Sequence, residues 1–547
     1  MENAAERKCF ASSVYEEGVK NTKSKILNSL PSKFRELHIN GDIHIHDLEG
    51  FNSVNNCCTL QLWEYFKKHA LEGTDDFGKI LETFEKIKVL ITNIANCQTG
   101  GIGFGNIDLD IAKLFDVSCI EYNPVNIKIL HTVIQNFIVW INEVRTRFCR
   151  ENYYLTINLG LAVSEWGREV TKAFLQEFMN SKIHFVKPNI VFKVHSKINS
   201  VKGTANYDLY LLAQTCTAKR MIPTYLLCDS DTNKKCVPEK LNIMGCRTRV
   251  YDNINGEVGS IGRGNIANVS INLPRLALKN KNYNDFKNAL KELIFECYGL
   301  LMLRKEALIN GYGEFQNYIF NERLWHDVWS INEMTKQGTY SIGFIGLSET
   351  VEVLTGQKYY ENESSVQLGM DIVKYMRSCV DWLKNENQIN FSLLATPGEL
   401  ISGRFCELDR QQYPHVIQEK GFYTNSFHVN VDSQLSIVDK IRIEGSFHQY
   451  CNGGSICYLE FASALLNNIE AIDDALKIAE ANGVSYIGFN YPLDICEECG
   501  YAGTYDICPA CGSSSIRRIR RVSGYLEDVT YFTNGKKQEV RYRKVNK

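Results

Sequence analysis

The chain has 547 residues, of which 44% are hydrophobic and 23% charged, and its formal net charge is −2 at pH 7. This composition predicts a globular protein with a large core, and the near-neutral charge excludes a protein whose whole surface is built to bind polyanions. The 19 cysteines are scattered and the first residues contain no apolar signal segment, which indicates a reducing compartment and a cytoplasmic location. No uncharged apolar run approaches the roughly 18 residues of a membrane span, so no membrane partner is expected.

The first motif in chain order is a pair of histidines. Gly41-Asp-Ile-His-Ile-His-Asp47 places His44 and His46 two residues apart, on one face of the chain if the run is extended. A metal-binding pair and two structural histidines are both compatible with this spacing. Because no third ligand follows nearby, we interpret both as part of the scaffold.

Two adjacent cysteines follow in Asn55-Asn-Cys-Cys-Thr-Leu-Gln-Leu62, where the alternating leucines predict a strand that enters a core. Taken alone, Cys57 and Cys58 are typical small core residues.

Apolar residues then recur at intervals of three and four from Ile80 to Ile94, which predicts a buried helix face, and residues 189–194 are predicted to form a strand. Predicted strands and helices alternate in this way, so the expected fold class is α/β.

A third cysteine of interest lies in Met244-Gly-Cys-Arg-Thr248. Cys246 stands between a glycine and an arginine in a polar setting, and positive neighbours and exposure favour thiol reactivity. From the residues alone, an ordinary loop cysteine is the alternative.

Four further cysteines form two CxxC pairs near the end of the sequence, Cys496-Glu-Glu-Cys499 and Cys508-Pro-Ala-Cys511. Each pair supplies two thiolates from one tight turn, which is the pattern of a tetrahedral Cys₄ zinc site; buried or redox cysteines are the alternative. Beyond residues 512–520 the sequence continues with Arg521-Val-Ser-Gly-Tyr-Leu526. Taken alone, its Gly524 predicts only a bulge or a turn in a strand.

Arg-Val-Ser-Gly-Tyr-Leu behind a Cys₄ pattern resembles the glycyl-radical loop of the anaerobic (class III) ribonucleotide reductases. The resemblance implies that Gly524 carries the radical, because a residue without a side chain lets an unpaired electron on its Cα spread into both flanking amides. Met-Gly-Cys-Arg resembles the finger loop of the same family, which implies that Cys246 becomes the thiyl radical. Asn56-Cys57 resembles an Asn-Cys segment of the same family. This resemblance implies that Cys57 acts on the face of the substrate opposite the radical thiol, with Cys58 as the alternative.

The resemblance also implies an architecture. The family fold is a ten-stranded α/β barrel built from two parallel five-stranded halves, with the finger loop and the glycyl loop meeting inside. We therefore expect a barrel body over residues 1–490, a zinc knuckle over 491–515, and the glycyl-radical loop with a C-terminal tail over 516–547. Because family-like sequence begins near Gly41, we expect no N-terminal ATP-cone and no overall activity switch.

The reaction implied by the resemblance replaces the 2′-hydroxyl of a ribonucleoside triphosphate with hydrogen. A separate radical-SAM activase would install the radical on Gly524, formate or a thiol protein would supply electrons, dNTPs and ATP would act as effectors, and the chain would form a homodimer. Two alternatives stay open. A glycyl-radical lyase acting on a small acid would share Gly524, and a nucleic-acid-binding zinc-ribbon protein would use the knuckle and the basic segment after it; the reductase interpretation requires no nucleic acid.

Overall fold

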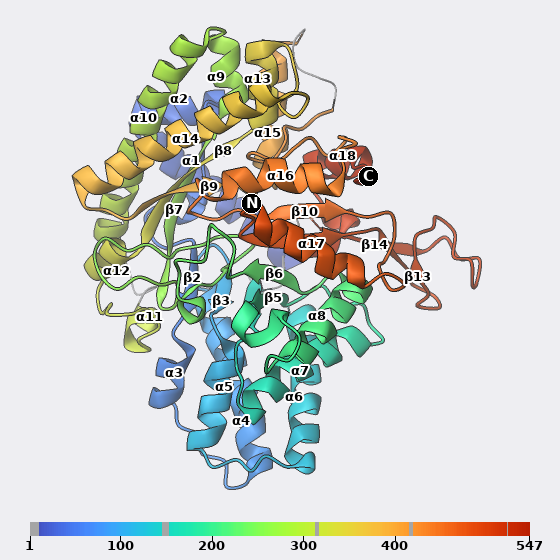
Figure 1. The fold of residues 1–547 in the computed structure, drawn as a ribbon. Coiled ribbons are helices and arrows are strands. Elements are labelled where there is room, and N and C mark those ends of the chain that lie inside the picture. Colours follow the sequence, from blue (N-terminus) through green and yellow to red (C-terminus); the bar gives the residue numbers. More distant parts are fainter. Residues whose placement is uncertain (1–9, 145–152, 312–316, 415–419, 522) are drawn as a thin grey trace.

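The computed structural model describes residues 10–144, 153–311, 317–414, 420–521 and 523–547. Val522, within the predicted glycyl loop, lies outside the described residues. Most of the chain forms one body around a central sheet, and a narrow arm projects from its side (Figure 1).

Within the described parts of the chain, ten strands follow one another around the central sheet, and an eleventh, β1 (Ile43–Ile45), pairs with β7 outside this path. In spatial order the ten are β10 (Cys457–Glu460), β11 (Tyr486–Asn490), β6 (Thr224–Leu227), β5 (Asn189–Val194), β4 (Leu155–Leu159), β3 (Ile102–Phe104), β2 (Cys57–Leu60), β7 (Arg263–Asn272), β8 (Thr339–Ile345) and β9 (Phe391–Ala395). Strands β2 to β6 are mutually parallel, as are β7, β8 and β9. The two sets meet in antiparallel pairs, β2 with β7 and β6 with β11.

The sheet closes on itself just before β10. Leu394 of β9 forms a parallel bridge with Gly454, in which the Gly453 amide donates to the Leu393 carbonyl at 2.8 Å and the Ala395 amide donates to the Gly454 carbonyl at 3.0 Å. Since β10 runs parallel to β11, the second set also contains five strands. The predicted α/β barrel of two parallel halves is therefore confirmed, and β1 is an addition to it.

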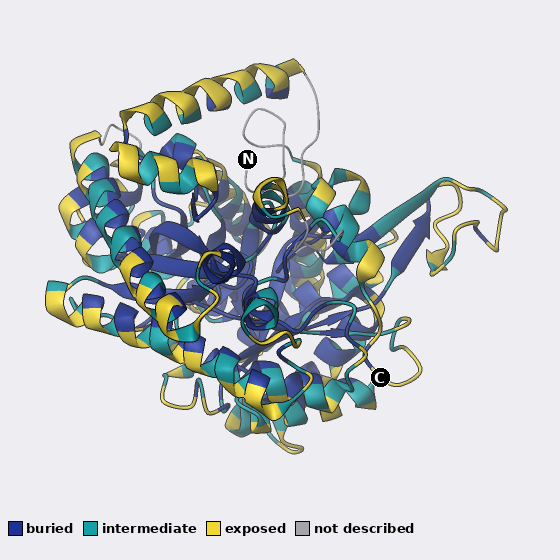
Figure 2. Ribbon diagram, turned by 90° about the horizontal axis from the view of Figure 1, so that it is seen from above, coloured by how far each residue is buried: buried dark blue, intermediate teal, exposed yellow. Residues whose placement is uncertain are grey.

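Helices cover the outside of this barrel, and Figure 2 shows buried strands at the centre and exposed residues on the outer helix faces. The helix predicted from apolar periodicity is α4 (Asp76–Ala95), whose residues from Ile80 to Ile94 bury one face. The Asp75 carboxylate caps it by accepting the Gly78 amide hydrogen at 2.8 Å. Other large helices include α1 (Phe10–Ser29), α5 (Ile107–Val117), α6 (Pro124–Glu143), α7 (Glu165–Asn180), α8 (Tyr207–Arg220), α10 (Tyr283–Gly311), α14 (Glu363–Asn387), α16 (Ile437–His448) and α17 (Glu470–Ala481).

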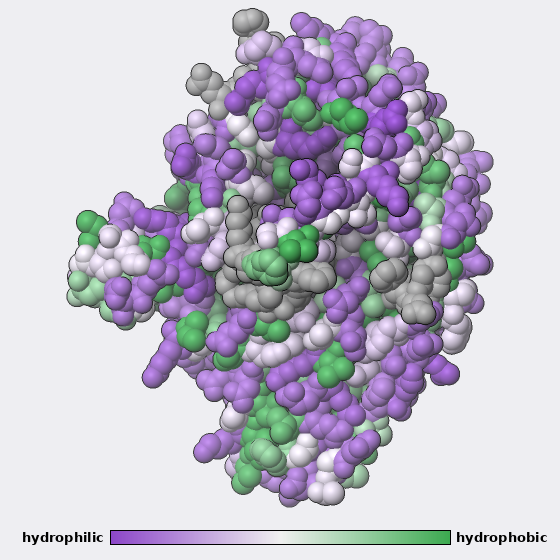
Figure 3. Space-filling model, turned by 180° about the vertical axis from the view of Figure 1, so that it is seen from behind, coloured by the Kyte–Doolittle hydropathy of each residue, from purple (hydrophilic) through white to green (hydrophobic). Residues whose placement is uncertain are grey.

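A second, four-stranded antiparallel sheet builds the arm and leads back to the barrel. Its strands are β13 (Ala502–Gly503), β12 (Leu493–Cys496), β14 (Ile516–Arg521) and β15 (Leu526–Asp528). From behind, the arm stands off the body as a separate lobe with a mixed surface (Figure 3). The chain then forms α18 (Asn534–Tyr542), which packs against α15 (Ile401–Gln412). Among the described residues, no helix is both long and apolar enough to cross a bilayer.

Candidate active site

A loop over residues 228–262, between β6 and β7, carries Cys246 into the barrel. The Met244 and Thr248 backbones exchange hydrogen bonds of 3.0 and 3.1 Å, so the tip is a tight hairpin. Gly245 at this tip has φ of 60°, a conformation that side chains disfavour. Asn158 of β4 anchors the loop, because its side chain accepts the Ile243 amide hydrogen at 3.0 Å and donates to the Ile243 carbonyl at 2.9 Å.

Gly524 lies in the loop between β14 and β15 and packs directly against this hairpin. A Cβ atom added to Gly524 would lie 2.1 Å from the Cys246 carbonyl oxygen and 2.4 Å from the Cys246 Cα. Contacts this short do not occur between non-bonded atoms, so no residue with a side chain fits without moving the backbone of Cys246. The structure thus brings together two residues that the sequence analysis selected from distant motifs.

The third predicted residue, Cys57, lines the same cavity as Cys246. Its Sγ accepts the Gly101 amide hydrogen at 3.0 Å. Alternate residues of a strand point to opposite faces, and Cys58 accordingly turns away, where its thiol donates to the Gln98 side chain at 2.9 Å within the main hydrophobic core. Of the two adjacent cysteines, Cys57 is the one that faces the cavity.

Burial controls the protonation of both cavity thiols. Loss of solvent raises the pKa of Cys246 to about 11, against an opposing effect of the neighbouring Arg247 charge. Loss of solvent also raises the pKa of Cys57 far above its ordinary value. Both groups are therefore neutral thiols at pH 7. A nucleophilic cysteine needs a lowered pKa, whereas hydrogen-atom transfer needs an intact S–H bond, so the site is suited to the second kind of chemistry.

The cavity wall contains polar residues to which the sequence analysis gave no catalytic role. They come from several strand ends and are His46, Asp47, Asn56, Thr99, Asn268, Thr396 and Glu399. We interpreted His46 as scaffold, and its Nε2 does lie 2.8 Å from the Ser270 hydroxyl, but the residue also borders the cavity. Thr396 and Glu399 directly follow β9, and the available signal in the sequence was Ala395-Thr-Pro-Gly-Glu399, a glycine-containing segment of the kind that lines pockets at the strand ends of barrels.

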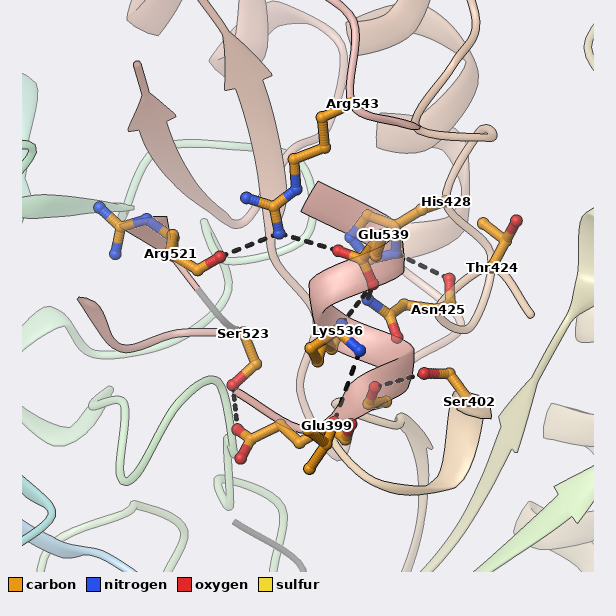
Figure 4. A network of polar contacts seen from close by, with 12 residues as sticks. Glu399, Ser402, Thr424, Asn425, His428, Arg521, Ser523, Lys536, Glu539 and Arg543 are labelled. Carbon is orange, nitrogen blue, oxygen red and sulfur yellow. Dashed lines mark hydrogen bonds and ion pairs between the residues drawn. The ribbon is translucent and has the colours of Figure 1, made fainter. Parts of the chain in front are cut away.

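Glu399 joins the cavity wall to the glycyl loop. The Ser523 hydroxyl donates to the Glu399 carboxylate, and the Thr533 hydroxyl donates to the Glu399 backbone carbonyl at 3.1 Å. Figure 4 shows Ser523 and Glu399 beside a larger network of charged residues, Lys536 and Glu539 of α18 and Arg543 just beyond it. The residue before Gly524 is therefore fixed to the barrel by a charge-assisted hydrogen bond.

The four cysteines of the CxxC pairs meet on the arm. Their Sγ atoms all lie within 4.8 Å of one another, and the distances from Cys496 to Cys511 and from Cys499 to Cys508 are both 3.5 Å. Four thiolates around a metal with bonds of about 2.3 Å would be separated by about 3.8 Å. The donor set and its dimensions therefore fit a tetrahedral metal ion such as zinc.

Acidic residues balance the basic residues of the arm. Arg518 pairs with Asp506 at 2.8 Å, and Arg520 pairs with Asp494 at 2.8 Å. These pairs offset the positive charge that a nucleic-acid-binding ribbon would present to phosphates. The geometry of the arm gives that alternative no support.

Comparisons with known proteins agree with the geometry. A family profile described as anaerobic ribonucleoside-triphosphate reductase matches residues 2–545. The protein of that name from Escherichia coli (strain K12) is 31% identical over 563 residues, which span 94% of this chain and 78% of that protein. The protein of that name from Enterobacteria phage T4 is 28% identical over 576 residues, spanning 94% and 92%.

Solved structures agree at the level of the fold. The anaerobic ribonucleotide reductase from Thermotoga maritima in complex with dATP and CTP superposes with a TM-score of 0.71 at 15% identity, over 95% of this chain and 89% of that one. A glycyl radical enzyme from Archaeoglobus fulgidus superposes with a TM-score of 0.58 at 10% identity, over 97% and 74%.

This closed α/β barrel, in which a glycine loop touches a cysteine hairpin, has the same fold as the solved anaerobic ribonucleotide reductase and glycyl radical enzyme. Among proteins of this fold, the chain belongs to the anaerobic ribonucleoside-triphosphate reductase family, since the family profile spans nearly all of it. The family resemblance of the sequence motifs is thereby confirmed.

Proposed function

We propose that this chain reduces ribonucleoside triphosphates to 2′-deoxyribonucleoside triphosphates by a glycyl-radical and thiyl-radical mechanism. The observation that carries the proposal is the direct packing of Gly524 against Cys246, at a cavity that Cys57 also lines. Family membership supports it, because the curated relatives carry this activity in their names.

The proposed cycle begins with radical storage on Gly524. A radical-SAM activase removes one hydrogen atom from its Cα, and the unpaired electron stays on the glycine. Cys246 then returns a hydrogen atom: its S–H bond breaks, the Cα–H bond of Gly524 re-forms, and the unpaired electron moves to sulfur. The buried, neutral state of the Cys246 thiol supports this role.

The substrate steps use the two thiols in turn. The thiyl radical of Cys246 takes the 3′-hydrogen of the ribose and becomes a thiol, and the 2′-hydroxyl takes up a proton and leaves as water. Cys57 then gives a hydrogen atom to C2′ and is left as a thiyl radical. Formate, our proposed reductant, gives its hydrogen atom to Cys57, passes one electron to the ribose and leaves as CO₂; a thiol protein is the alternative reductant. Cys246 finally returns a hydrogen atom to C3′ and is again a thiyl radical.

We further propose that Cys496, Cys499, Cys508 and Cys511 hold one zinc ion. Zinc has no redox chemistry in such a closed four-thiolate site, so its contribution is structural. In this chain Cys496 ends β12, the other three ligands lie between β12 and β14, and Cys496 pairs with Ile516 across those strands. A metal here would therefore stabilise the sheet from which the glycyl loop emerges.

The proposed partners follow from the same assignment. They are an activase for the glycyl radical, a second copy of the chain in a homodimer, and dNTP or ATP effectors. The proposal of nucleotide effectors is supported by the Thermotoga maritima reductase, which has been solved with dATP bound in the specificity site.

Anaerobic electron paramagnetic resonance (EPR) tests the proposal. After incubation with the cognate activase, the protein should give a glycyl-radical doublet and should convert CTP to dCTP with formate present. Gly524→Ala should give neither, and Cys246→Ser should give the doublet without dCTP. A radical-bearing protein that binds no nucleoside triphosphate would favour the lyase alternative, and tight, steeply salt-dependent DNA binding without a radical would favour the zinc-ribbon alternative.

A further inference from the structure

The guanidinium of Arg521 lies beneath the glycyl loop and contacts the residue that carries the proposed radical. Its Nη1 donates to the Gly524 carbonyl oxygen at 2.9 Å. Its Nε donates to the Asn490 side-chain oxygen at 2.7 Å, and its Nη2 donates to the Met221 carbonyl. All three acceptors are neutral oxygens, and the Arg521 side chain is 1% exposed. The Gly524 carbonyl therefore accepts its hydrogen bond from a buried cationic donor, which it shares with the other two oxygens; Glu460 is the acidic residue whose charge reaches Arg521.

The C-terminal helix holds Arg521 in this place. Arg543 Nη2, just beyond α18, donates to the Arg521 carbonyl at 2.9 Å, and the same nitrogen lies 2.8 Å from the Glu539 carboxylate. Glu539 also pairs with Lys536, one turn away on α18. Figure 4 shows Arg543 between the Arg521 carbonyl and Glu539, with Lys536 beside Glu539. On the other side of the loop, Ser523 is held by Glu399, so the Gly524 carbonyl cannot easily turn away from the guanidinium.

A hydrogen bond to this carbonyl distinguishes the radical from the closed-shell glycine. When Gly524 loses a hydrogen atom from Cα, the unpaired electron spreads into both flanking amides. The amide nitrogen donates electron density, and the carbonyl oxygen gains partial negative charge. A cationic donor on that oxygen interacts more strongly with the radical than with glycine, as donors aimed at developing charge do in other sites.

We propose that Arg521 is a positioning and tuning residue that stabilises the radical on Gly524 through its carbonyl oxygen. The proposal rests on the proposed function, since it takes Gly524 as the radical site. It concerns the exchange in which the Cys246 S–H bond breaks, the Gly524 Cα–H bond forms and the unpaired electron moves to sulfur. Arg521 shifts this exchange toward the glycyl side, so that the radical rests on carbon between turnovers.

The decisive measurement uses the native side chain. Protein labelled with guanidino-¹⁵N arginine, activated anaerobically, should show a ¹⁵N hyperfine coupling to the glycyl radical in pulsed EPR. The coupling should vanish in Arg521→Lys and persist in Arg520→Gln. Arg520 is the matched control because it neighbours Arg521 on β14 but pairs with Asp494 on the other side of the strand.

A second readout follows the stability of the radical. In Arg521→Gln the α-proton splitting of the doublet should widen, because less of the unpaired spin reaches the carbonyl. The EPR signal should also decay about tenfold faster, because the radical loses one hydrogen bond to a charged group. A wild-type radical without arginine ¹⁵N coupling, or an Arg521→Gln doublet of unchanged splitting and lifetime, would overturn the assignment of Arg521 and leave the proposed function standing. No glycyl signal in activated wild-type protein would refute both.

Discussion

Gly454 closes the barrel and also contacts the loop over residues 228–262 that carries Cys246. Its replacement by alanine should therefore lower both the stability of the fold and the activity of the site. Its φ is 125°, and a Cβ atom there would lie 2.1 Å from the Arg247 carbonyl oxygen and 2.9 Å from the Arg249 amide nitrogen. The backbone conformation costs about 1–3 kcal/mol for a residue with a side chain, and forcing apart a packed contact costs about 1–3 kcal/mol more. We expect Gly454→Ala to lower the free energy of unfolding by about 2–6 kcal/mol.

The same change should move Cys246, because the Arg247 carbonyl must retreat from the new methyl group. A displacement of about 1 Å at a reacting group can reduce the rate about 100-fold. Anaerobic dCTP formation should therefore fall by about that factor, measured at a temperature at which urea titration shows the variant to be fully folded.

Gly356→Ala is the matched control for this experiment. Gly356 has φ of 77° at the end of a helix, and a Cβ atom there would meet nothing within 4 Å. It should cost about 1–2 kcal/mol of stability, from the backbone conformation alone, and leave dCTP formation unchanged. Normal dCTP formation by folded Gly454→Ala would refute the argument that barrel closure positions the finger loop.

The other predictions concern the metal, the thiols and pH. Cys511→Ser should lose the bound zinc, measured by elemental analysis, together with the glycyl EPR signal; a metal-free protein that is still fully activated would contradict this. Cys246→Ser should keep that signal but release no tritium from 3′-labelled substrate, whereas Cys57→Ser should release tritium and form free base instead of dCTP; product from Cys246→Ser would exclude the thiyl step. His131 has its pKa raised, mainly by its hydrogen bond to Glu169. Its stabilising effect should be complete below its unfolded pKa of about 6.5 and be lost as pH rises through the folded value, so the stability difference from His131→Gln in urea titrations should shrink over that range; a constant difference would contradict it.

Features that depend on nearby residues were predictable from the sequence. The spacing of the four CxxC cysteines brings their sulfurs together through two tight turns, and the apolar period from Ile80 to Ile94 describes one buried face of α4. The motif resemblance then supplied Cys246 and Gly524, which no local pattern joins.

Features that depend on how distant segments meet were not predictable in the same way. Two adjacent cysteines do not reveal which one faces a cavity; only the pairing of β2 with β3 and β7 determines that Cys57 does. His46 was expected to be structural because it lacks a third ligand nearby, yet strand β1 carries it to the cavity wall. Arg521 belongs to a recognised motif, but its role depends on the loop returning to place the Gly524 carbonyl over its guanidinium.

The position of the glycyl loop in chain order has a consequence for synthesis. Every strand of the barrel precedes Gly524 in the sequence, so a ribosome completes the barrel strands, with Cys57 and Cys246, before it adds the loop. A chain still in synthesis therefore contains both thiols but no residue able to hold the proposed radical. The contacts of Arg521 with Met221 and Asn490, and of Ser523 with Glu399, can form only after this last part of the chain has been made.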